Sequence, residues 1–519
     1  MSGVLWQHTG RRASWFEESL PARLAKCEYR VHGPSSGGCS TDNRHAISLE
    51  EPMFDDLRGF LGALEGRGLL CRVRAEVDWD LEIGAIQRRI FDREGPALIF
   101  ERVRGHRWPL VSGVLGTPER VALALGCEPE PRKMITVLRD ATENPIPPEL
   151  VAKGVCQQNV DRGAAIDVLK FPTPKWHRLD GGRYIGTLGL VITRDPETGR
   201  RNVGVYREQI LGPNRIALNA TQQVGTLWQK WRRAGRPMPV ATAIGVDPAS
   251  MIGSLVQAKL GDDEYAIAGG LRGKPLELVR CVSQDLEVPA NAEIVLEGEI
   301  SPDGELVQEG PFGEFTGYYG LETMSPVINL TAVTYRDAPI LQGTLEGAPP
   351  GESTSLRTLT HSAGAWAKLD RMSIPGLKDV YITDMGCANF MVIASMQRQF
   401  YFGHARQLIA AIWANNVNAK WVIVVNDDIN IYDRRQVEWA LATRVAPYRD
   451  IWVTPQNQPS TNLDPAIAPD DRHYPNIRGS RVGIDATEDY KGYEFPPQTR
   501  LLPEEYARVD ARWHEYGLP

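Results

Sequence analysis

The stretch YIGTLGLVIT (residues 184–193), followed by DPETG (195–199) and NVGVYREQ (202–209), decides the fold of the middle of the chain. The two outer segments are rich in apolar and β-branched residues, and the Asp-Pro and Gly between them are typical of a turn, so the pattern predicts two paired strands. Further strands are predicted at residues 276–282, 292–300 and 327–335, with one helix at 222–233. Several strands with tight turns predict a barrel or sandwich-like domain.

The segments on either side predict mixed α/β structure. Apolar side chains recur at helical spacing in residues 55–66 and 80–93, and short apolar runs at 97–100 and 109–112 predict strands. In the last third, a helix at 404–415, a strand at 421–425 and a helix at 434–445 predict a parallel α/β unit. A length of 519 residues suggests about three domains. We therefore expect an extension of unknown role at residues 1–52, an N-terminal α/β domain at 53–155, a central β-domain at 156–350 and a C-terminal α/β domain at 351–519 that ends in a charged helix.

Composition narrows the function. The formal net charge is −7, without the basic excess of a nucleic-acid-binding protein. The most apolar runs fall far short of the roughly 18 residues that a membrane span needs. The seven cysteines contain no C-x-x-C pair, which predicts neither a disulfide framework nor a structural zinc site. With no apolar segment typical of a secretory signal, we expect a cytoplasmic protein.

Three clusters in the middle of the chain could carry chemistry. Asn202–Arg207 and the acidic triplet Asp262-Asp263-Glu264 are, taken alone, ordinary surface residues. Glu309-Gly310-Pro311-Phe312-Gly313-Glu314 is more specific, because its glycines let the backbone double back and bring two carboxylates together. Two carboxylates beside an arginine can have different pKa values, so that one stays ionised while the other holds a proton. From these residues alone, a structural bend is about as probable as a site.

Taken together, the order and spacing of these clusters resemble the UbiD family of reversible decarboxylases, which use prenylated FMN. The resemblance covers about residues 55 to 500 and is most specific at E-G-P-F-G-E, followed by Phe315-Thr316-Gly317-Tyr318. Asn-x-Gly-x-Tyr-Arg at 202–207, Glu264 before Tyr265-Ala266, and Gly483-Ile484-Asp485-Ala486-Thr487 also match. The implied fold is α/β (α+β), with a central split β-barrel of flavin-reductase type that binds the cofactor and a C-terminal α/β domain with a dimerisation helix.

The resemblance implies a catalytic network of Arg207, Glu309 and Glu314. Prenylated FMN would form a covalent adduct with the substrate and act as an electron sink, since no side chain can stabilise a carbanion in the plane of an aromatic ring. Glu314 would then deliver the proton to carbon as a general acid, while Arg207 positions the cofactor and keeps Glu309 ionised.

The family also holds the flavin phosphate through a divalent metal, usually Mn²⁺, with K⁺ nearby. Asn202 and Glu264 match two of the metal ligands, whereas Gln223 stands where the family has histidine. An amide oxygen suits a hard ion, so the metal site is either rich in oxygen donors and weaker, or completed by water. The backbone amides of the family's phosphate-cradling loop match Gly253, Ser254 and Leu255. The complete set of expected cofactor-binding residues is Asn202, Val205, Tyr206, Arg207, Gln222, Gln223, Gly253, Ser254, Leu255 and Glu264.

The sequence gives less direct information about the substrate and the partners of the protein. Residues 361–366, 390–391 and Thr487 are expected to line the pocket and to favour an aromatic or heteroaromatic acid, although a polycyclic acid or an aryl-CoA ester stays open. The expected partners are the acid and CO2, a flavin prenyltransferase that supplies the cofactor, and further copies of the chain in a homodimer or hexamer. Three alternatives remain: a flavin-binding oxidoreductase, disfavoured because no G-x-G-x-x-G follows a strand; a non-catalytic subunit of a larger carboxylase; and a divalent-metal hydrolase.

Overall fold

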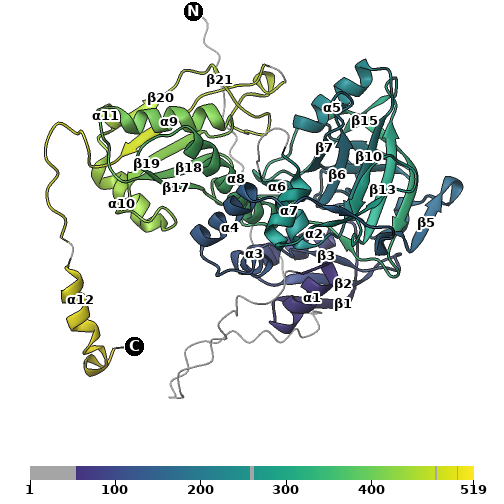
Figure 1. Ribbon diagram of the computed structural model, residues 1–519, viewed down its shortest axis with the longest axis horizontal. Coiled ribbons are helices and arrows are strands. Elements are labelled where there is room, and N and C mark those ends of the chain that lie inside the picture. Colours follow the sequence, from purple (N-terminus) through teal and green to yellow (C-terminus); the bar gives the residue numbers. More distant parts are fainter. Residues whose placement is uncertain (1–53, 257–261, 474–475, 500, 519) are drawn as a thin grey trace, which may run out of the picture. The chain divides into compact units, whose positions relative to one another are not determined.

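The computed structural model describes residues 54–519, apart from 257–261, 474–475, 500 and 519. The expected extension at 1–52 lies outside the described residues. The described part has a mixed α/β fold, in which separate sheets form around different segments of the chain (Figure 1). In this part, no helix combines the length and the apolar character that crossing a membrane requires.

The N-terminal segment builds a four-stranded sheet in the order β1-β2-β3-β16, whose last strand comes from much later in the chain. Amphipathic helices cover it; α1, for example, buries Leu57, Phe60, Leu61 and Leu64 on one face. The elements are α1 (Leu57–Gly66), β1 (Leu70–Val77), α2 (Glu82–Phe91), β2 (Ala97–Val103), β3 (Leu110–Ser112), α3 (Pro118–Leu125), α4 (Pro131–Glu143) and β16 (Leu341–Gln342).

The central segment builds a nine-stranded sheet whose main path is β7-β6-β10-β13-β15-β9-β8, with β5 and β14 also paired to β15. Its strands are β5 (Asn159–Arg162), β6 (Gly189–Arg194), β7 (Arg201–Val205), β8 (Glu208–Gly212), β9 (Arg215–Leu218), β10 (Met238–Ile244), β13 (Ile294–Ile300), β14 (Leu306–Glu309) and β15 (Thr323–Tyr335). A smaller sheet joins β4 (Glu149–Leu150), β11 (Glu277–Arg280) and β12 (Glu287–Pro289).

The structure corrects the predicted strand at 202–209, which is two strands. β7 pairs with β6 and β8 pairs with β9, so consecutive strands occupy opposite ends of the path, and only Tyr206 and Arg207 separate them. The sheet must therefore curl. The backbone of Arg183 and Ile185, just before β6, also hydrogen-bonds to β8. Among the described strands no full ladder closes a barrel, and the split barrel stays a prediction.

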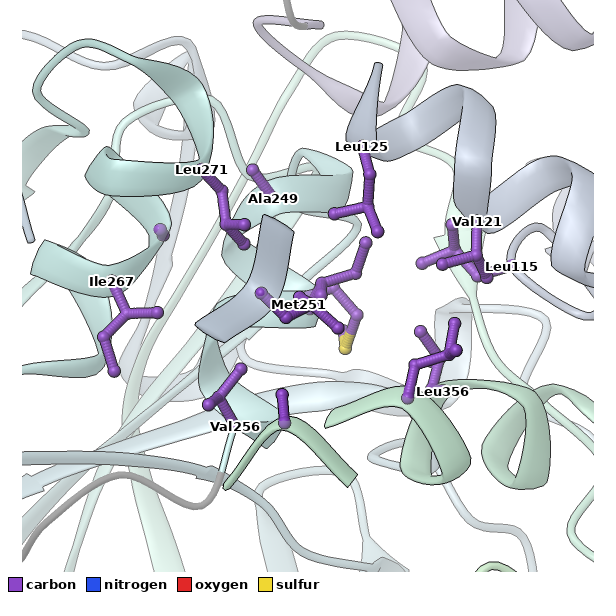
Figure 2. Packing of buried hydrophobic residues seen from close by; sticks show 14 of the residues in the cluster. Leu115, Val121, Leu125, Ala249, Met251, Val256, Ile267, Leu271 and Leu356 are labelled. Atoms are coloured by element: carbon purple, nitrogen blue, oxygen red, sulfur yellow. The ribbon is translucent and has the colours of Figure 1, made fainter. Parts of the chain in front are cut away.

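The expectation of one helix among the central strands was also wrong. Besides α5 (Gln222–Arg233), the structure has α6 (Pro248–Leu255) and α7 (Glu264–Arg272). Every residue of α6 except Leu255 is buried, so it lacks the polar face that marks a surface helix in a sequence. Figure 2 shows Met251 of α6 among Leu125 of α3, Ile267 of α7 and Leu356 of the later helix α8 (Glu352–Arg371).

The C-terminal segment begins with the long helix α8 (Glu352–Arg371) and forms a five-stranded sheet in the order β17-β18-β19-β23-β20. β18, β19 and β23 run parallel, as expected for an α/β unit. The elements are β17 (Leu377–Ile382), β18 (Met391–Met396), α9 (His404–Asn415), β19 (Trp421–Asn426), α10 (Arg434–Arg444), α11 (Pro447–Asp450), β20 (Ile451–Val453), β21 (Gln458–Pro459), β22 (Arg478–Gly479), β23 (Val482–Ala486) and α12 (Pro503–Asp510).

Candidate active site

Arg207 lies between the two strands that end the central sheet, and this position directs its side chain to two glutamates. Its Nε and Nη2 atoms donate to the two carboxylate oxygens of Glu309, each at 2.8 Å. Its Nη1 atom donates to Oε1 of Glu314. One guanidinium therefore bridges the two carboxylates, in the two-pronged geometry that arginine makes best.

Glu309 is fully buried at the end of β14 and is surrounded by donors. Besides Arg207, it accepts hydrogen bonds from the Tyr184 hydroxyl at 2.8 Å, Asn219 Nδ2 at 2.9 Å and the Thr323 hydroxyl at 3.2 Å. Burial acts to raise the pKa of Glu309, but the charge of Arg207 and these hydrogen bonds outweigh it and lower the pKa below its ordinary value. The carboxylate is ionised.

Glu314 lies at the other end of the carboxylate bend, residues 309–314, and has a different environment. Among the described residues its carboxylate accepts a hydrogen bond from Arg207 alone. Burial raises the pKa of Glu314 to about 7; the charge of Arg207 opposes this rise and that of Glu346 adds to it. The two glutamates share one cation, yet the structure keeps one ionised and lets the other hold a proton near neutral pH.

The close packing of the bend requires a glycine beside Glu314. A Cβ atom at Gly313 would lie 2.2 Å from Cδ2 of His177. The Gly313 amide donates to Asp180 Oδ1 at 3.0 Å, and the Glu314 amide donates to the Tyr318 carbonyl at 3.0 Å. Residues of the segment before β6, His177 and Asp180, therefore pack against the carboxylate bend and hydrogen-bond to it.

The three residues expected to hold a metal also come together. Nδ2 of Asn202, in β7, donates to Oε1 of Gln223 at 2.6 Å, and Glu264, at the start of α7, accepts from the amide of Val203 at 3.3 Å. The Asn202 Oδ1 atom is buried and has no hydrogen-bond partner among the residues that the structure describes. Burial, with a smaller contribution from the charge of Asp263, raises the pKa of Glu264 to about 7. A buried amide oxygen beside a half-buried carboxylate fits a hard divalent cation, which would also favour the ionised carboxylate. Within the described ranges no group of three or more His, Cys, Asp or Glu forms a metal centre, so an ion here would depend on the two amides.

The other expected cofactor residues surround this cluster or adjoin it. Val205 ends β7, the Tyr206 ring lies against Gly204, where a Cβ atom would be 2.8 Å from Cε2 of the ring, and Gln222 begins α5. Gly253, Ser254 and Leu255 form the last turn of α6 rather than a loop. The amides of a last helical turn ordinarily donate to carbonyls of the preceding turn, so their role toward a phosphate stays a prediction.

The residues expected to line the substrate pocket have different surroundings in the structure, and their contact with a substrate stays a prediction. Phe390 lies 6.0 Å from Phe315, ring centroid to ring centroid, and Phe315 directly follows the carboxylate bend. Thr487 is fully buried, with its hydroxyl donating to Asp485 at 2.7 Å and accepting from Gln399 at 2.8 Å, so it cannot line a pocket. Tyr184 and Asn219 were missed, because a lone tyrosine or asparagine in a strand-rich sequence gives no signal.

Comparison with known proteins decides the family. Three consecutive family models match the chain: the N-terminal domain of 3-octaprenyl-4-hydroxybenzoate carboxy-lyase at residues 61–137, its Rift-related domain at 149–349 and its C-terminal domain at 354–486. The chain belongs to the UbiD family. UbiD-family proteins are carboxy-lyases, and this chain is accordingly an enzyme of that class.

Solved UbiD structures resemble the chain over most of its length. The UbiD-class enzyme HmfF from Pelotomaculum thermopropionicum, in complex with FMN, is 36% identical, and the match covers 88% of this chain and 99% of that one with a TM-score of 0.77. Vanillic acid decarboxylase from Sedimentibacter hydroxybenzoicus is 29% identical over 90% of this chain and all of its own, with a TM-score of 0.80. The 3,4-dihydroxybenzoic acid decarboxylase from Enterobacter cloacae is 28% identical over 88% and 99%, with a TM-score of 0.76.

Proposed function

We propose that this UbiD enzyme is a reversible, non-oxidative decarboxylase of an aromatic or heteroaromatic carboxylic acid that uses prenylated FMN. The observation that carries the proposal is the single guanidinium of Arg207 between an ionised Glu309 and a Glu314 that can hold a proton. A flavin-binding oxidoreductase has no need of such a pair. Relatives determined with FMN and prenylated FMN support the choice of cofactor.

The residues present fit a flavin phosphate held through a metal ion. Asn202 Oδ1, Gln223 Oε1 and the Glu264 carboxylate would supply oxygen ligands to Mn²⁺ or another divalent ion, and K⁺ would bind nearby. The curled sheet, whose end strands meet at Tyr206 and Arg207, supports a split barrel of flavin-reductase type. Such a barrel would carry Asn202 on β7 and Arg207 just beyond the end of that strand.

The chain's own side chains would bind, orient and move a proton. Bound prenylated FMN would supply the electron sink that decarboxylation of an aromatic acid requires. Arg207 would hold Glu309 ionised and keep the Glu314 carboxyl in place. Glu314 would deliver its proton to the carbon that loses CO2, and its pKa of about 7 is suited to a donor near neutral pH.

The assembly and the cofactor supply complete the proposal. A flavin prenyltransferase would provide the cofactor. The side chains of α12 are exposed throughout, as expected for a helix that packs on a second copy in a homodimer or hexamer.

The test is Glu314→Gln in protein co-expressed with a flavin prenyltransferase. Glutamine keeps the shape of the side chain but cannot supply the proton, so we expect CO2 release to fall at least about 100-fold while absorbance and intact mass still show bound flavin. Glu208→Gln is the matched control, because Glu208 is fully buried next to Arg207 in sequence and bonds to Thr242 instead of the site. Unchanged turnover of Glu314→Gln would remove the proton-donor role, and a loaded wild-type protein inert toward every aromatic acid would contradict the proposed function.

A further inference from the structure

The two carboxylate oxygens of Glu309 are filled by donors from separate segments of the chain. Oε1 accepts from Arg207 Nε and from the Tyr184 hydroxyl, each at 2.8 Å. Oε2 accepts from Arg207 Nη2 at 2.8 Å, from Asn219 Nδ2 at 2.9 Å and from the Thr323 hydroxyl at 3.2 Å. A carboxylate offers about four lone-pair positions, so a proton on Glu309 would have to displace one of these bonds.

Tyr184 makes its bond to Glu309 from a buried and fixed position. The side chain is 1% exposed, and its ring packs 4.4 Å from that of Phe312 in the carboxylate bend, centroid to centroid. The hydroxyl also lies 3.2 Å from Gln209 Oε1, which accepts the Gly310 amide at 3.1 Å. A hydroxyl has one hydrogen, and the shorter, charge-assisted bond to Glu309 is the stronger of the two. Burial and the charge of Glu309 raise the pKa of Tyr184, so the hydroxyl keeps this hydrogen.

Asn219 holds the second oxygen of Glu309 with a group that can only donate. Its Nδ2 atom lies 2.9 Å from Oε2 of Glu309 and 3.3 Å from the Thr323 hydroxyl. Its backbone amide donates to the Arg207 carbonyl at 3.1 Å, which ties Asn219 to the segment that carries the guanidinium. An amide N–H cannot accept a hydrogen bond, so this side chain favours the ionised form of Glu309.

Glu309 and Glu314 compete for a proton because they share the guanidinium of Arg207, and Glu314 has no other donor among the described residues. We propose that Tyr184 and Asn219 are positioning residues, which place the proton of this pair on Glu314 by occupying the oxygens of Glu309. Tyr184 is too deeply buried to contact a bound molecule and acts through Glu309. The inference rests on the proposed function, in which Glu314 is the proton donor, and adds the residues that keep this donor protonated.

Further titratable groups face the network: Glu346 and Arg357 near Glu314, Asp180 near Tyr184, and His177 against the carboxylate bend. The charge of Glu346 favours the protonated form of Glu314, and that of Arg357 favours the ionised form. These four groups are unchanged in the variants below, so a moved proton reports the loss of a donor to Glu309.

The first test uses the loaded holoenzyme and follows kcat and KM against pH. Tyr184→Phe keeps the ring but removes one donor, and Tyr184→Phe/Asn219→Ala removes two. Each loss should move the proton equilibrium toward Glu309 by about tenfold, since a hydrogen bond to a charged group is of that strength. We expect kcat of the single variant to fall at acidic pH, where Glu309 becomes protonated and releases Arg207, whereas that of the wild type stays level. In the double variant, kcat should fall about threefold or more at neutral pH as well, with KM within about twofold of the wild type.

The second test locates the proton in the apoprotein, without turnover. In a Glu314→Gln background, infrared difference spectra follow the C=O stretch of protonated carboxyls as the pH is lowered. The band that Glu309→Gln removes belongs to Glu309. We expect its titration midpoint to rise by about one pH unit for each donor removed, which is the same tenfold shift in the proton equilibrium.

Tyr432→Phe is the matched control. The Tyr432 hydroxyl donates to the carboxylate of Asp379 at 2.8 Å, the distance found between Tyr184 and Glu309, but in the C-terminal segment. This variant should lower the melting temperature about as much as Tyr184→Phe does, because it loses the same kind of bond. It should leave the pH dependence of kcat and the titration midpoint of Glu309 unchanged.

The outcomes separate this inference from the proposed function. An unchanged Glu309 midpoint, or a pH dependence of kcat that changes equally in Tyr432→Phe and Tyr184→Phe, would show that the two side chains only support the fold and would overturn the inference. If Tyr184→Phe does not fold, the same midpoint in Asn219→Ala decides, because Asn219 is only partly buried. If the loaded wild-type enzyme releases no CO2 from any acid, the proposed function fails, while the midpoints of the apoprotein still decide where the pair keeps its proton.

Discussion

The site around Arg207 and the site around Asn202 lie close together in the chain but are completed differently. Around Arg207 the protein itself supplies four side-chain partners to Glu309. Around Asn202 an amide oxygen is buried without a hydrogen-bond partner in the described part of the chain, and desolvation raises the pKa of the Glu264 carboxyl. The fold therefore pre-organises the arrangement around Arg207 without a ligand, whereas the arrangement around Asn202 would be completed by the divalent ion that we propose to bind there.

The largest effect is expected from Arg207→Met. This change leaves Glu309 buried without its cation, and breaking a buried ion pair from one side costs about 3–5 kcal/mol. We expect a lower melting temperature for the apoprotein as well as a loss of CO2 release beyond about 1000-fold. Differential scanning fluorimetry and a turnover assay on the same preparation measure both quantities.

Arg194→Met is the matched control for that change. The Nη2 atom of Arg194 donates to both carboxylate oxygens of Glu287, at 2.6 and 2.7 Å, and both side chains are only partly buried. We expect a much smaller loss of stability and nearly normal turnover. Equal destabilisation by the two substitutions would contradict the view that the fold pre-organises the Arg207 site in particular.

The substitution Asn202→Ala is expected to have a smaller effect, and to change the affinity for a metal ion more than the stability of the protein. The substitution removes one hydrogen bond, from Asn202 Nδ2 to Gln223 Oε1, so the apoprotein should melt only slightly below the wild-type temperature, while the affinity for Mn²⁺ falls about 10- to 100-fold. Gln223→His should change affinity in the opposite direction for softer transition metals, since imidazole suits them better than an amide. Metal titration of the apoproteins measures these constants.

Asn291→Ala provides the control for the orphaned oxygen. Asn291 Oδ1 is also buried without a partner, but its Nδ2 donates to the backbone of Asp55 and to Asp247, away from Glu264. Manganese binding should be unaffected by this variant. If both asparagine variants lose manganese to the same extent, the ion does not bind at Asn202.

The sequence predicted which side chains meet at the carboxylate bend better than it predicted the topology of the central sheet. Arg207, Glu309 and Glu314 could be found because two carboxylates, two glycines and a proline within six residues form a dense motif that few other patterns resemble. The break between β7 and β8 could not, because Asn202–Gln209 is uniformly compatible with one strand, and only pairing with β6 and β9 at opposite sheet ends divides it. The helix α6 was missed for a related reason, since a helix buried all round shows no periodicity.

Thr487 shows a limit of a different kind. It belongs to a motif that correctly indicated the family, yet the structure buries it in a hydrogen-bond network with Asp485 and Gln399. A motif match therefore predicted membership in the family but not contact with the substrate.

The smallest expected effect is on pH dependence, and it tests the contrast between the two glutamates of the bend. A proton donor is active only while protonated, so with a pKa of about 7 for Glu314 the rate at saturating acid should be level below pH 7 and fall about tenfold per unit above it. The pKa of Glu309 is lowered, so Glu309 stays ionised throughout that range and causes no further change in the pH–rate profile.

Glu346→Gln sharpens this prediction, because Glu346 adds a negative charge that disfavours ionisation of Glu314. Removing that charge should lower the pKa of Glu314 and move the falling limb to lower pH, with bound flavin unchanged. Glu488→Gln, which removes a charge paired with Arg444 in the C-terminal segment, should leave the limb in place. A limb that stays near pH 7 in Glu346→Gln and disappears only with substitutions at the metal site would assign the titration to Glu264, and Glu314 would then have to donate its proton without the raised pKa that its burial provides.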